Sequence, residues 1–475
     1  MFIGREQELE FLNKRYKSNQ AEFIVVYGRR RVGKTELLTE FCRDKPSFFY
    51  ICNEYTGSKQ FASFSDALFA FAPSLHKSIR RFSDWEDAFS ALGELPGDKK
   101  TVVVIDEFPY MCRGDKSIPS VIQNLWDSKL RNANIMFIIS GSSISFIEDE
   151  LLGVKNPLYG RATGIYKLEP MPFEDAVKFF PDYSDEDKIL AFSVLGGVPH
   201  YLKQFDPDNT LENNIKEKIL TKGTVLFNEV EYILHQELRE PVAYITLLEA
   251  IAYGNCKFGE ICSNAHMESS KVSVYLKNLL ELGFVMREFP VLTTAKDKTK
   301  KNIGEYRLSD NFFRFWFAYA YRYMSELEQG EAEIIWRQVI EKDLHRFASK
   351  TFEEVAIRYL RLQNRFGLLP FTFLSVGRWW GNVKHRDEKG KPYSLPEEID
   401  ILACSEHEKR FIIGECKFRN EAFDMRELEK LRAKHERKGE IYYYLFSLGG
   451  FTDKVKEEAN IQNNIALITP SDMLK

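Results

Sequence analysis

The sequence predicts an α/β fold built around a parallel sheet, and three stretches carry that prediction. Residues 23–27 form an apolar, β-branched run that stops at Gly28, and a stretch with helical spacing begins after Gly33. Residues 101–105 and 135–143 contain two further runs of this kind, and each ends in polar residues. Continuous apolar strands that alternate with helices are typical of parallel sheets covered on both faces.

Residues 28–35 read GRRRVGKT, which fits the pattern G-x-x-x-x-G-K-[ST] between a strand and a helix. Gly28 and Gly33 lack side chains, so backbone N–H groups can surround a polyphosphate, and the helix N-terminus adds its positive dipole end. We expect Lys34 to reach the β- and γ-phosphates and the Thr35 hydroxyl to hold Mg²⁺. The alternative is a glycine-containing turn that binds nothing.

Residues 101–110 read TVVVIDEFPY and resemble a Walker B motif. A buried parallel strand would deliver Asp106 and Glu107 at its carboxyl end, where α/β sheets bind ligands. We expect Asp106 to hold Mg²⁺, directly or through water, and Glu107 to orient and deprotonate the attacking water. A strand capped by solvated acids is the alternative. The residues expected to bind ATP are Gly28, Arg29, Arg30, Arg31, Val32, Gly33, Lys34, Thr35, Glu36 and Asp106.

Two later positions are candidates for sensing or stabilising the phosphate. Ser140 or Ser142, at the end of the run 135–143, would sense the γ-phosphate, unless the run simply ends in a turn. Arg161 lies in the loop PLYGR and would act as an arginine finger on the transferring phosphoryl group. An ordinary surface arginine is an equally good interpretation of Arg161.

Length and composition limit the classes of protein. A chain of 475 residues is too long for one core and suggests about three domains. The net charge of −4 means that any nucleic-acid-binding surface must be local. The start MFIGREQELEFL has no signal-peptide core, and the apolar stretch 312–321 is short and contains Arg314. We therefore expect a soluble, cytoplasmic protein with no membrane segment.

Six stretches occur in a recognisable order: GREQELEFL, GRRRVGKT, VVVIDEFPY, SGSS, PLYGRATG and GGVPHYL. With them the first half of the chain resembles the archaeal-type ATPase family, in the AAA+/STAND branch of P-loop proteins. The resemblance implies ATP as the ligand, a P-loop ATPase core over residues 1–170 and a helical lid over 171–235. It also implies that the Gly-Gly-x-Pro turn at 196–199 lies near the nucleotide. His200 stands where many relatives carry arginine, which puts a charged sensor at that turn in doubt.

Residues 236–325 show a winged-helix pattern. Three short helical stretches, 243–253, 257–264 and 269–283, precede two short strands, 284–290 and 306–308. In such domains the third helix can enter a major groove and the wing can contact phosphates. A solvated loop on a packing domain is the alternative, because the third helix is only weakly basic. The candidate DNA contacts are Lys271, Lys277 and the wing lysines Lys296, Lys298, Lys300 and Lys301.

Residues 335–475 are expected to form an α/β domain of another kind. A long helix over 343–362, strands over 398–403 and 411–418, a helix, a strand over 441–446, a helix and a last strand over 465–468 follow one another. This order resembles the restriction-endonuclease-like PD-(D/E)xK fold.

The residues that match its motif are Asp400, Glu415 and Lys417, with Ile399 where the motif name has proline. The resemblance implies that Asp400 and Glu415 hold Mg²⁺ while Lys417 stabilises the developing phosphorane charge. Glu353, or its neighbour Glu354, would add a ligand. An ordinary hairpin with an ion pair between its strands is the alternative.

Taken together, the sequence predicts an α/β protein with four parts: a P-loop NTPase sheet, a helical lid, a winged-helix module and a restriction-endonuclease-like domain. We expect an ATP-hydrolysing protein that couples its nucleotide state to nucleic-acid binding or to Mg²⁺-dependent cleavage. DNA is a candidate partner, and a homo-oligomer is a candidate assembly. Two alternatives stay open: a STAND-type signalling switch with an inactive C-terminal platform, and a transcription regulator that uses the winged helix alone.

Overall fold

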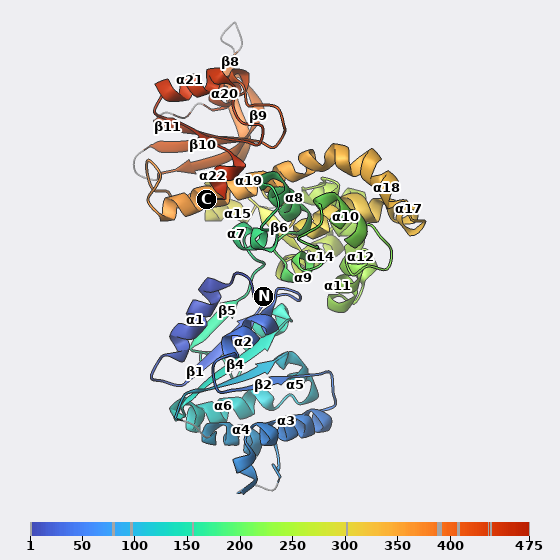
Figure 1. The fold of residues 1–475 in the computed structure, drawn as a ribbon, viewed down its shortest axis with the longest axis vertical. Coiled ribbons are helices and arrows are strands. Elements are labelled where there is room, and N and C mark those ends of the chain that lie inside the picture. The colour runs from blue at the N-terminus through green and yellow to red at the C-terminus, as the bar shows by residue number, and fades with distance from the viewer. Residues whose placement is uncertain are drawn as a thin grey trace. The chain divides into compact units, whose positions relative to one another are not determined.

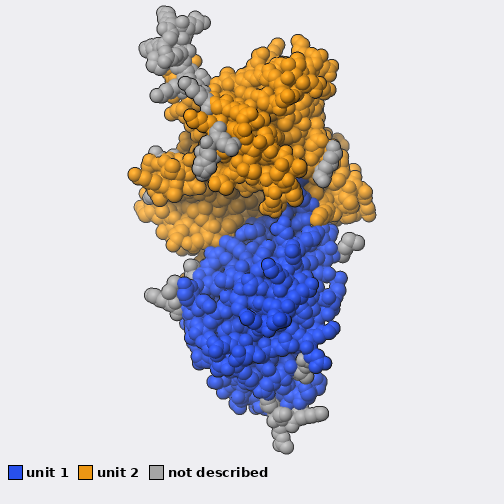
Figure 2. Space-filling view, turned by 90° about the vertical axis from the view of Figure 1, so that its left-hand side faces the viewer, with its two compact units in different colours: residues 1–175, 198–200 blue, residues 176–197, 201–475 orange. Residues whose placement is uncertain are grey.

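The computed structural model describes residues 2–77, 81–95, 98–153, 156–300, 303–386, 392–405, 409–435, 437 and 439–474. The chain forms two compact units (Figure 1, Figure 2). Unit 1 comprises Met1–Asp175 with Val198–His200, and unit 2 comprises Ala176–Gly197 with Tyr201–Lys475.

Unit 1 is built on a parallel sheet of five strands in the order β2-β3-β4-β1-β5 (Figure 1). The three central strands are buried along their whole length, as their β-branched sequences predict. The five strands are β1 (Glu22–Tyr27), β2 (Ser47–Ile51), β3 (Thr101–Asp106), β4 (Ile135–Gly141) and β5 (Gly164–Lys167).

Helices cover both faces of this sheet. Alternate residues of β1 point to opposite sides, so that Ile24 packs with Leu12 and Leu37 while Phe23 packs with Phe64 and Phe137. The first face carries α1 (Glu6–Tyr16) and α2 (Lys34–Cys42); the second carries α3 (Gly57–Phe71), α4 (Trp85–Ala91), α5 (Phe108–Gly114) and α6 (Ile118–Ser128).

The first part of unit 2 is helical and ends in a two-stranded antiparallel ribbon. Three helices and the ribbon occupy the stretch where the sequence predicts a winged helix: α12 (Pro241–Ala252), α13 (Phe258–Ala265), α14 (Ser269–Glu281), β6 (Val285–Glu288) and β7 (Glu305–Leu308). A short helix, α15 (Ala295–Lys298), lies between the strands where only a loop is expected. Before them come α8 (Asp185–Leu195), α10 (Leu211–Lys218) and α11 (Glu229–Glu237), while the residues of α7 (Phe173–Ala176) and α9 (Pro199–Leu202) are divided between the two units.

An aromatic helix joins these elements inside unit 2. Trp316 is fully buried and donates a hydrogen bond from its indole nitrogen to the carbonyl oxygen of Phe227, 2.8 Å away. Phe312 packs on Tyr201, and Asn311 donates to the carbonyl of Phe192 at the end of α8. The segment begins as α16 (Asn311–Phe315) and is followed by α17 (Met324–Glu328), α18 (Ala332–Ile335) and α19 (Glu341–Arg365).

The last part of unit 2 is a mixed sheet in the order β12-β11-β10-β9-β8. Strands β8 and β9, the first two in the chain, form an antiparallel hairpin. The sequence predicts only the second half of β9 as a strand. Strands β10, β11 and β12 run parallel to one another and are joined by helices. The elements are β8 (Ser375–Arg386), β9 (Pro392–Cys404), β10 (Arg410–Lys417), α20 (Met425–Ala433), β11 (Glu440–Ser447), α21 (Asp453–Ile461), β12 (Ile465–Ile468) and α22 (Pro470–Met473).

This architecture confirms the predicted α/β class with its parallel five-stranded sheet. The two compact units are a coarser division than the predicted segments 1–170, 171–235, 236–325 and 335–475, so that four-part division stays a prediction. Among the helices of the described ranges, none combines the length and the apolar composition that a membrane span needs.

Candidate active site

The loop between β1 and α2 has the backbone that a phosphate loop needs. A Cβ atom on Gly28 would lie 2.3 Å from the carbonyl oxygen of Leu168, so no other residue fits there. Gly33 has φ of +90°, a conformation that glycine adopts without the cost of a Cβ clash. Both glycines of the motif are therefore required by the geometry of the loop.

Lys34 is folded back into this loop. Its Nζ atom donates to the carbonyl oxygens of Gly28 and Arg29, at 2.8 and 3.1 Å, and only 5% of the residue is exposed. The ammonium group thus lies inside the curve of backbone that the first helical turn of α2 closes. This position suits a cation that contacts phosphate oxygens.

Thr35 and Asp106 bring together the carboxyl end of β3 and the N-terminus of α2. The Thr35 hydroxyl donates to Oδ2 of Asp106 at 2.5 Å, and Oδ1 of Asp106 accepts from the backbone N–H of Glu107 at 2.9 Å. Asp106 is completely buried. A hydroxyl and a carboxylate in contact are oxygen ligands of the kind that Mg²⁺ prefers, so these two residues fit a magnesium ion bound with a nucleotide.

Glu107 follows in a left-handed backbone conformation, with φ of +51°, which is uncommon for a residue with a side chain. Its carboxylate accepts hydrogen bonds from the hydroxyl and from the backbone N–H of Ser142, at the end of β4. The two sequence candidates on β4 are thereby distinguished: Ser142 contacts the predicted catalytic base. Ser140 is fully buried, and its hydroxyl has no hydrogen-bond partner among the described residues.

One residue of this site has no assigned role in the sequence analysis. Arg5, only 3% exposed, donates to the carbonyl oxygens of Val32 and Glu169, at 2.9 and 2.8 Å, and pairs with Glu8. It therefore fixes the phosphate loop to the chain that follows β5. The signal was present in the GREQELEFL stretch, whose arginine comes directly before a helix.

The Gly-Gly-x-Pro turn returns to unit 1 through Val198–His200. Pro199 approaches Gly33 so closely that a Cβ on that glycine would lie 3.6 Å from the proline ring. This contact places Pro199, the last residue of the turn, beside the phosphate loop.

Arg161 does not join the other predicted residues. Its guanidinium forms two parallel hydrogen bonds to the Asp127 carboxylate, including one of 2.6 Å, and it donates to the carbonyl of Pro157. Arg161 precedes β5, at the amino edge of the sheet, whereas the phosphate loop follows β1 at the carboxyl edge. Within one chain Arg161 is therefore remote from Lys34, and a finger role toward a neighbouring copy stays a prediction.

The C-terminal candidates Asp400, Glu415 and Lys417 do lie together, on adjacent antiparallel strands of unit 2. Oδ2 of Asp400 accepts from the backbone N–H of Cys416 at 2.9 Å. The two oxygens of Glu415 accept from Lys417 at 2.5 Å and from Lys434 at 2.8 Å. The predicted trio thus forms one cluster, and Lys434 adds a second lysine that the motif does not include.

Charge and burial perturb this cluster. Burial, together with the Glu415 and Glu353 carboxylates, raises the pKa of Asp400 to about 7. Burial alone would lower the pKa of Lys417, but the Glu415 carboxylate outweighs it and the pKa is raised. Glu353 pairs with Lys350 at 2.8 Å and with Arg378 at 3.3 Å. Within the described residues no three acidic, histidine or cysteine side chains form a group that would hold a metal ion, so a metal role for Glu353, Asp400 and Glu415 stays a prediction.

The helix predicted to read DNA presents its basic residues to solvent. Lys271 and Lys277 on α14 are 51% and 76% exposed, and each has an acidic neighbour, Glu240 at 3.8 Å and Glu281 at 3.5 Å. Of the wing lysines, Lys296, Lys298 and Lys300 are exposed, and Lys301 lies outside the described residues.

Comparison with known proteins matches three stretches of the chain to families. Residues 2–205 match a family described as an ATPase domain predominantly from Archaea. Residues 245–287 match bacterial regulatory proteins of the arsR family, and residues 316–434 match archaeal and bacterial proteins of unknown function.

Individual relatives match different shares of the chain. An uncharacterized protein of Methanocaldococcus jannaschii is 33% identical over 88% of this chain and 88% of its own. An uncharacterized ATP-binding protein of Pyrococcus horikoshii is 27% identical over 42% of this chain and 73% of its own. The solved structure of a Walker-type ATPase of Pyrococcus abyssi, 19% identical, superposes with a TM-score of 0.50 over 67% of this chain and 96% of that one, which shows a shared fold.

The family match therefore includes the phosphate loop, Lys34 and the Asp106–Glu107 pair. The relative from Methanocaldococcus jannaschii matches 88% of the chain. The chain belongs to the archaeal ATPase family and is an ATPase.

Proposed function

We propose that ATP binding and hydrolysis in unit 1 control how unit 2 engages nucleic acid. The observation that supports this most is the presence of three features in one chain: a phosphate loop, a stretch that matches arsR-family regulators and a perturbed carboxylate–lysine cluster. We also propose the predicted four-part division of the chain and a cytoplasmic location. Because Arg161 is remote from the phosphate loop of its own chain, we propose that it acts as an arginine finger on the ATP bound by a neighbouring copy.

The residues of unit 1 divide the chemistry among them. The backbone of residues 28–33 and Lys34 hold the β- and γ-phosphates, while Thr35 and Asp106 hold Mg²⁺. Bound by these two residues, Mg²⁺ would supply positive charge to offset the charge that develops on the transferring phosphoryl group. Glu107 orients the attacking water and accepts its proton, and the hydrogen bonds from Ser142 compete with that water for the same two carboxylate oxygens.

An ATPase assay on the wild type, Lys34→Ala and Glu107→Gln, each with and without DNA, tests this function. We expect Lys34→Ala to lose nucleotide affinity and Glu107→Gln to retain it while kcat falls by about 100-fold or more. DNA should stimulate the wild type. Equal rates with and without DNA would instead favour the signalling switch.

A second candidate function, the catalytically inactive platform, is favoured by one observation. Each oxygen of the Glu415 carboxylate already accepts a hydrogen bond from a lysine, which leaves less capacity for a metal ion. Mg²⁺-dependent cleavage of single- or double-stranded DNA or RNA that disappears in Asp400→Ala and Lys417→Ala would establish the nuclease. Absence of cleavage under every nucleotide condition would establish the platform.

A further inference from the structure

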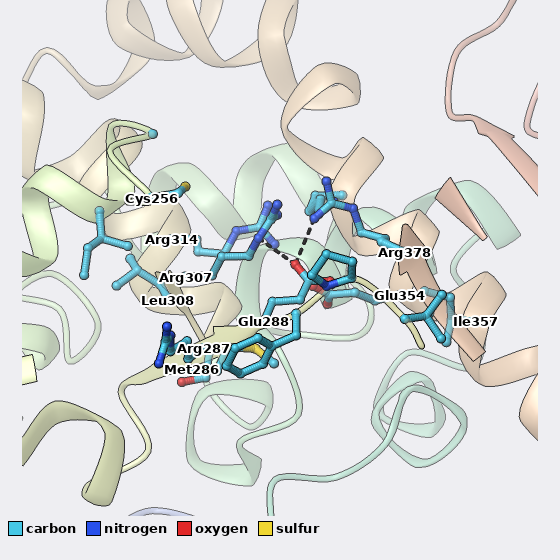
Figure 3. Close-up of a pocket in the computed structure, with 18 of the residues that line it drawn as sticks. Cys256, Met286, Arg287, Glu288, Arg307, Leu308, Arg314, Glu354, Ile357 and Arg378 are labelled. Carbon is cyan, nitrogen blue, oxygen red and sulfur yellow. Dashed lines mark hydrogen bonds and ion pairs between the residues drawn. The ribbon is translucent and has the colours of Figure 1, made fainter. Parts of the chain in front are cut away.

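Unit 2 contains a cavity of about 1470 Å³ that no motif of the sequence predicts (Figure 3). Its wall is formed by the ribbon β6–β7, the aromatic segment after α16, the helix α19 and the start of β8. Nine arginines and lysines line it, against three carboxylates, although the whole chain has a net charge of −4. The cavity therefore concentrates positive charge that the rest of the molecule does not have.

Part of this charge is neutralised by the protein itself. Glu288 contacts Arg307 at 2.7 Å and Arg378 at 2.8 Å, and Figure 3 shows it between them. Asp343 pairs with Arg346 at 2.5 Å. The remaining carboxylate, Glu354, faces several cations. Among the described residues no carboxylate oxygen lies within 4.0 Å of five of the lining cations, which are Arg287, Lys298, Arg314, Arg322 and Arg361.

Aromatic rings lie beside these cations. The guanidinium of Arg287 is 4.8 Å from the ring centroid of Phe289, and that of Arg314 is 5.2 Å from the centroid of Phe347. Tyr253, 48% exposed, also lines the cavity. Guanidinium groups match phosphate oxygens, and exposed rings stack on bases. Cations that alternate with rings are the arrangement that binds a nucleotide chain.

The size of the cavity distinguishes between nucleic-acid forms. The volume exceeds the roughly 300–1,000 Å³ of pockets for drug-sized ligands, so more than one nucleotide fits. A duplex, whose major groove alone is ~12 Å wide and ~8.5 Å deep, needs more room than a cavity of about 1470 Å³ gives, so the cavity suits a single strand.

The cavity also adjoins the C-terminal cluster. Lys350 and Arg378 line it, and both contact Glu353, at 2.8 and 3.3 Å. Glu353 is in turn close enough to Asp400 to raise the pKa of that carboxyl group. We propose that the cavity binds a short segment of single-stranded nucleic acid and directs it toward Asp400 and Lys417. This inference deepens the proposed function, on which it rests, by naming the form of nucleic acid that unit 2 takes.

The test is fluorescence anisotropy with a short labelled oligothymidylate at low salt, without ATP. The variant Arg322→Gln/Arg361→Gln removes two exposed cations of the cavity, and Arg365→Gln, on the same helix α19 but outside the cavity, is the matched control. We expect the double variant to raise Kd at least tenfold and to reduce the salt slope by about 0.7 for each lost phosphate contact. The control should bind like the wild type.

Two further arms make the result decisive. Phe289→Leu keeps every charge and should still weaken binding about fivefold or more, because it removes a stacking ring. Free ATP, titrated against the oligonucleotide in a Lys34→Ala background, should compete only weakly. Wild-type affinity in the double variant, or full displacement by ATP, would overturn the inference. If DNA still stimulates the ATPase in that case, the proposed function stands and only the cavity assignment fails.

Discussion

At the scale of single residues, the nucleotide site depends on side chains that hold the loop as well as on those that touch phosphate. Arg5 donates two hydrogen bonds to backbone carbonyls, one of them on Val32 inside the loop. Hydrogen bonds to a charged group contribute about 1.5–3 kcal/mol each, more than a neutral pair. The geometry of the loop therefore depends on a residue far from it in sequence.

We predict that Arg5→Gln raises the Kd for ATP about tenfold, because the loop loses the bond that fixes its Val32 carbonyl. Isothermal titration calorimetry measures this directly, with Arg43→Gln, an exposed residue after α2, as control. An unchanged Kd in Arg5→Gln would mean that the loop holds its shape without the arginine.

Ser142 is the second such residue, because it binds the carboxylate that must activate water. Ser142→Ala removes one of the two bonds that hold Glu107, so we expect a several-fold higher basal kcat with little change in KM. Ser140→Ala, on the same strand, should leave kcat unaltered. A fall of kcat in Ser142→Ala would point instead to the sensing role that the sequence predicts.

The protonation of Asp400 makes the stability of the folded protein depend on pH. Its folded-state pKa of about 7 lies above the ordinary value of 3.8, so between these values the folded protein binds a proton that the unfolded chain releases. Stability is therefore lost as the pH rises through this window.

Asp400→Asn avoids that loss and retains an acceptor for the Cys416 N–H. In EDTA we expect its free energy of unfolding to exceed the wild-type value by about 1–3 kcal/mol near pH 8, which is less than the whole pKa shift of Asp400 would give. Near pH 4 the two proteins should have the same free energy of unfolding. Urea denaturation at both pH values measures the difference, with the exposed Asp453→Asn as control. If Asp400→Asn were less stable than the wild type near pH 8, the ionised Asp400 carboxylate would not destabilise the folded protein, which would contradict the prediction.

At the scale of elements, the sequence predicts best where one physical cause dominates. The runs before Gly28, Asp106 and Ser140 are uniformly apolar because both faces of the sheet are covered, and each forms a buried strand. The hairpin β8–β9 was assigned only in its last part, because residues 375–386 mix tryptophan, glycine and basic residues without alternation. Contacts such as Arg5 to Val32 or Arg161 to Asp127 depend on how distant elements meet, and no local pattern encodes them.

The helix α14 carries a prediction of its own. If it docks on duplex DNA, Lys271→Gln/Lys277→Gln should weaken binding uniformly across sequences. The slope of log Kobs against log salt should fall by about 0.9 for each lost phosphate contact. Gel-shift titrations over a salt series measure the slope. An unchanged slope would mean that α14 does not contact DNA phosphates and only packs within unit 2.

At the scale of the whole molecule, the proposed function requires that nucleotide state and nucleic-acid affinity be coupled. Such coupling is reciprocal: if ATP alters the affinity for DNA, DNA alters the affinity for ATP by the same factor. A coupling of about 1–3 kcal/mol, typical of switching proteins, corresponds to a change of roughly 5- to 150-fold.

The most direct test is the Kd for DNA of Glu107→Gln, measured with saturating ATP and Mg²⁺ and again without nucleotide. This variant should bind ATP without turning it over, so each state is stable during the titration. We expect the two values to differ at least fivefold and Lys34→Ala to show no difference. Equal affinities in both nucleotide states would contradict it.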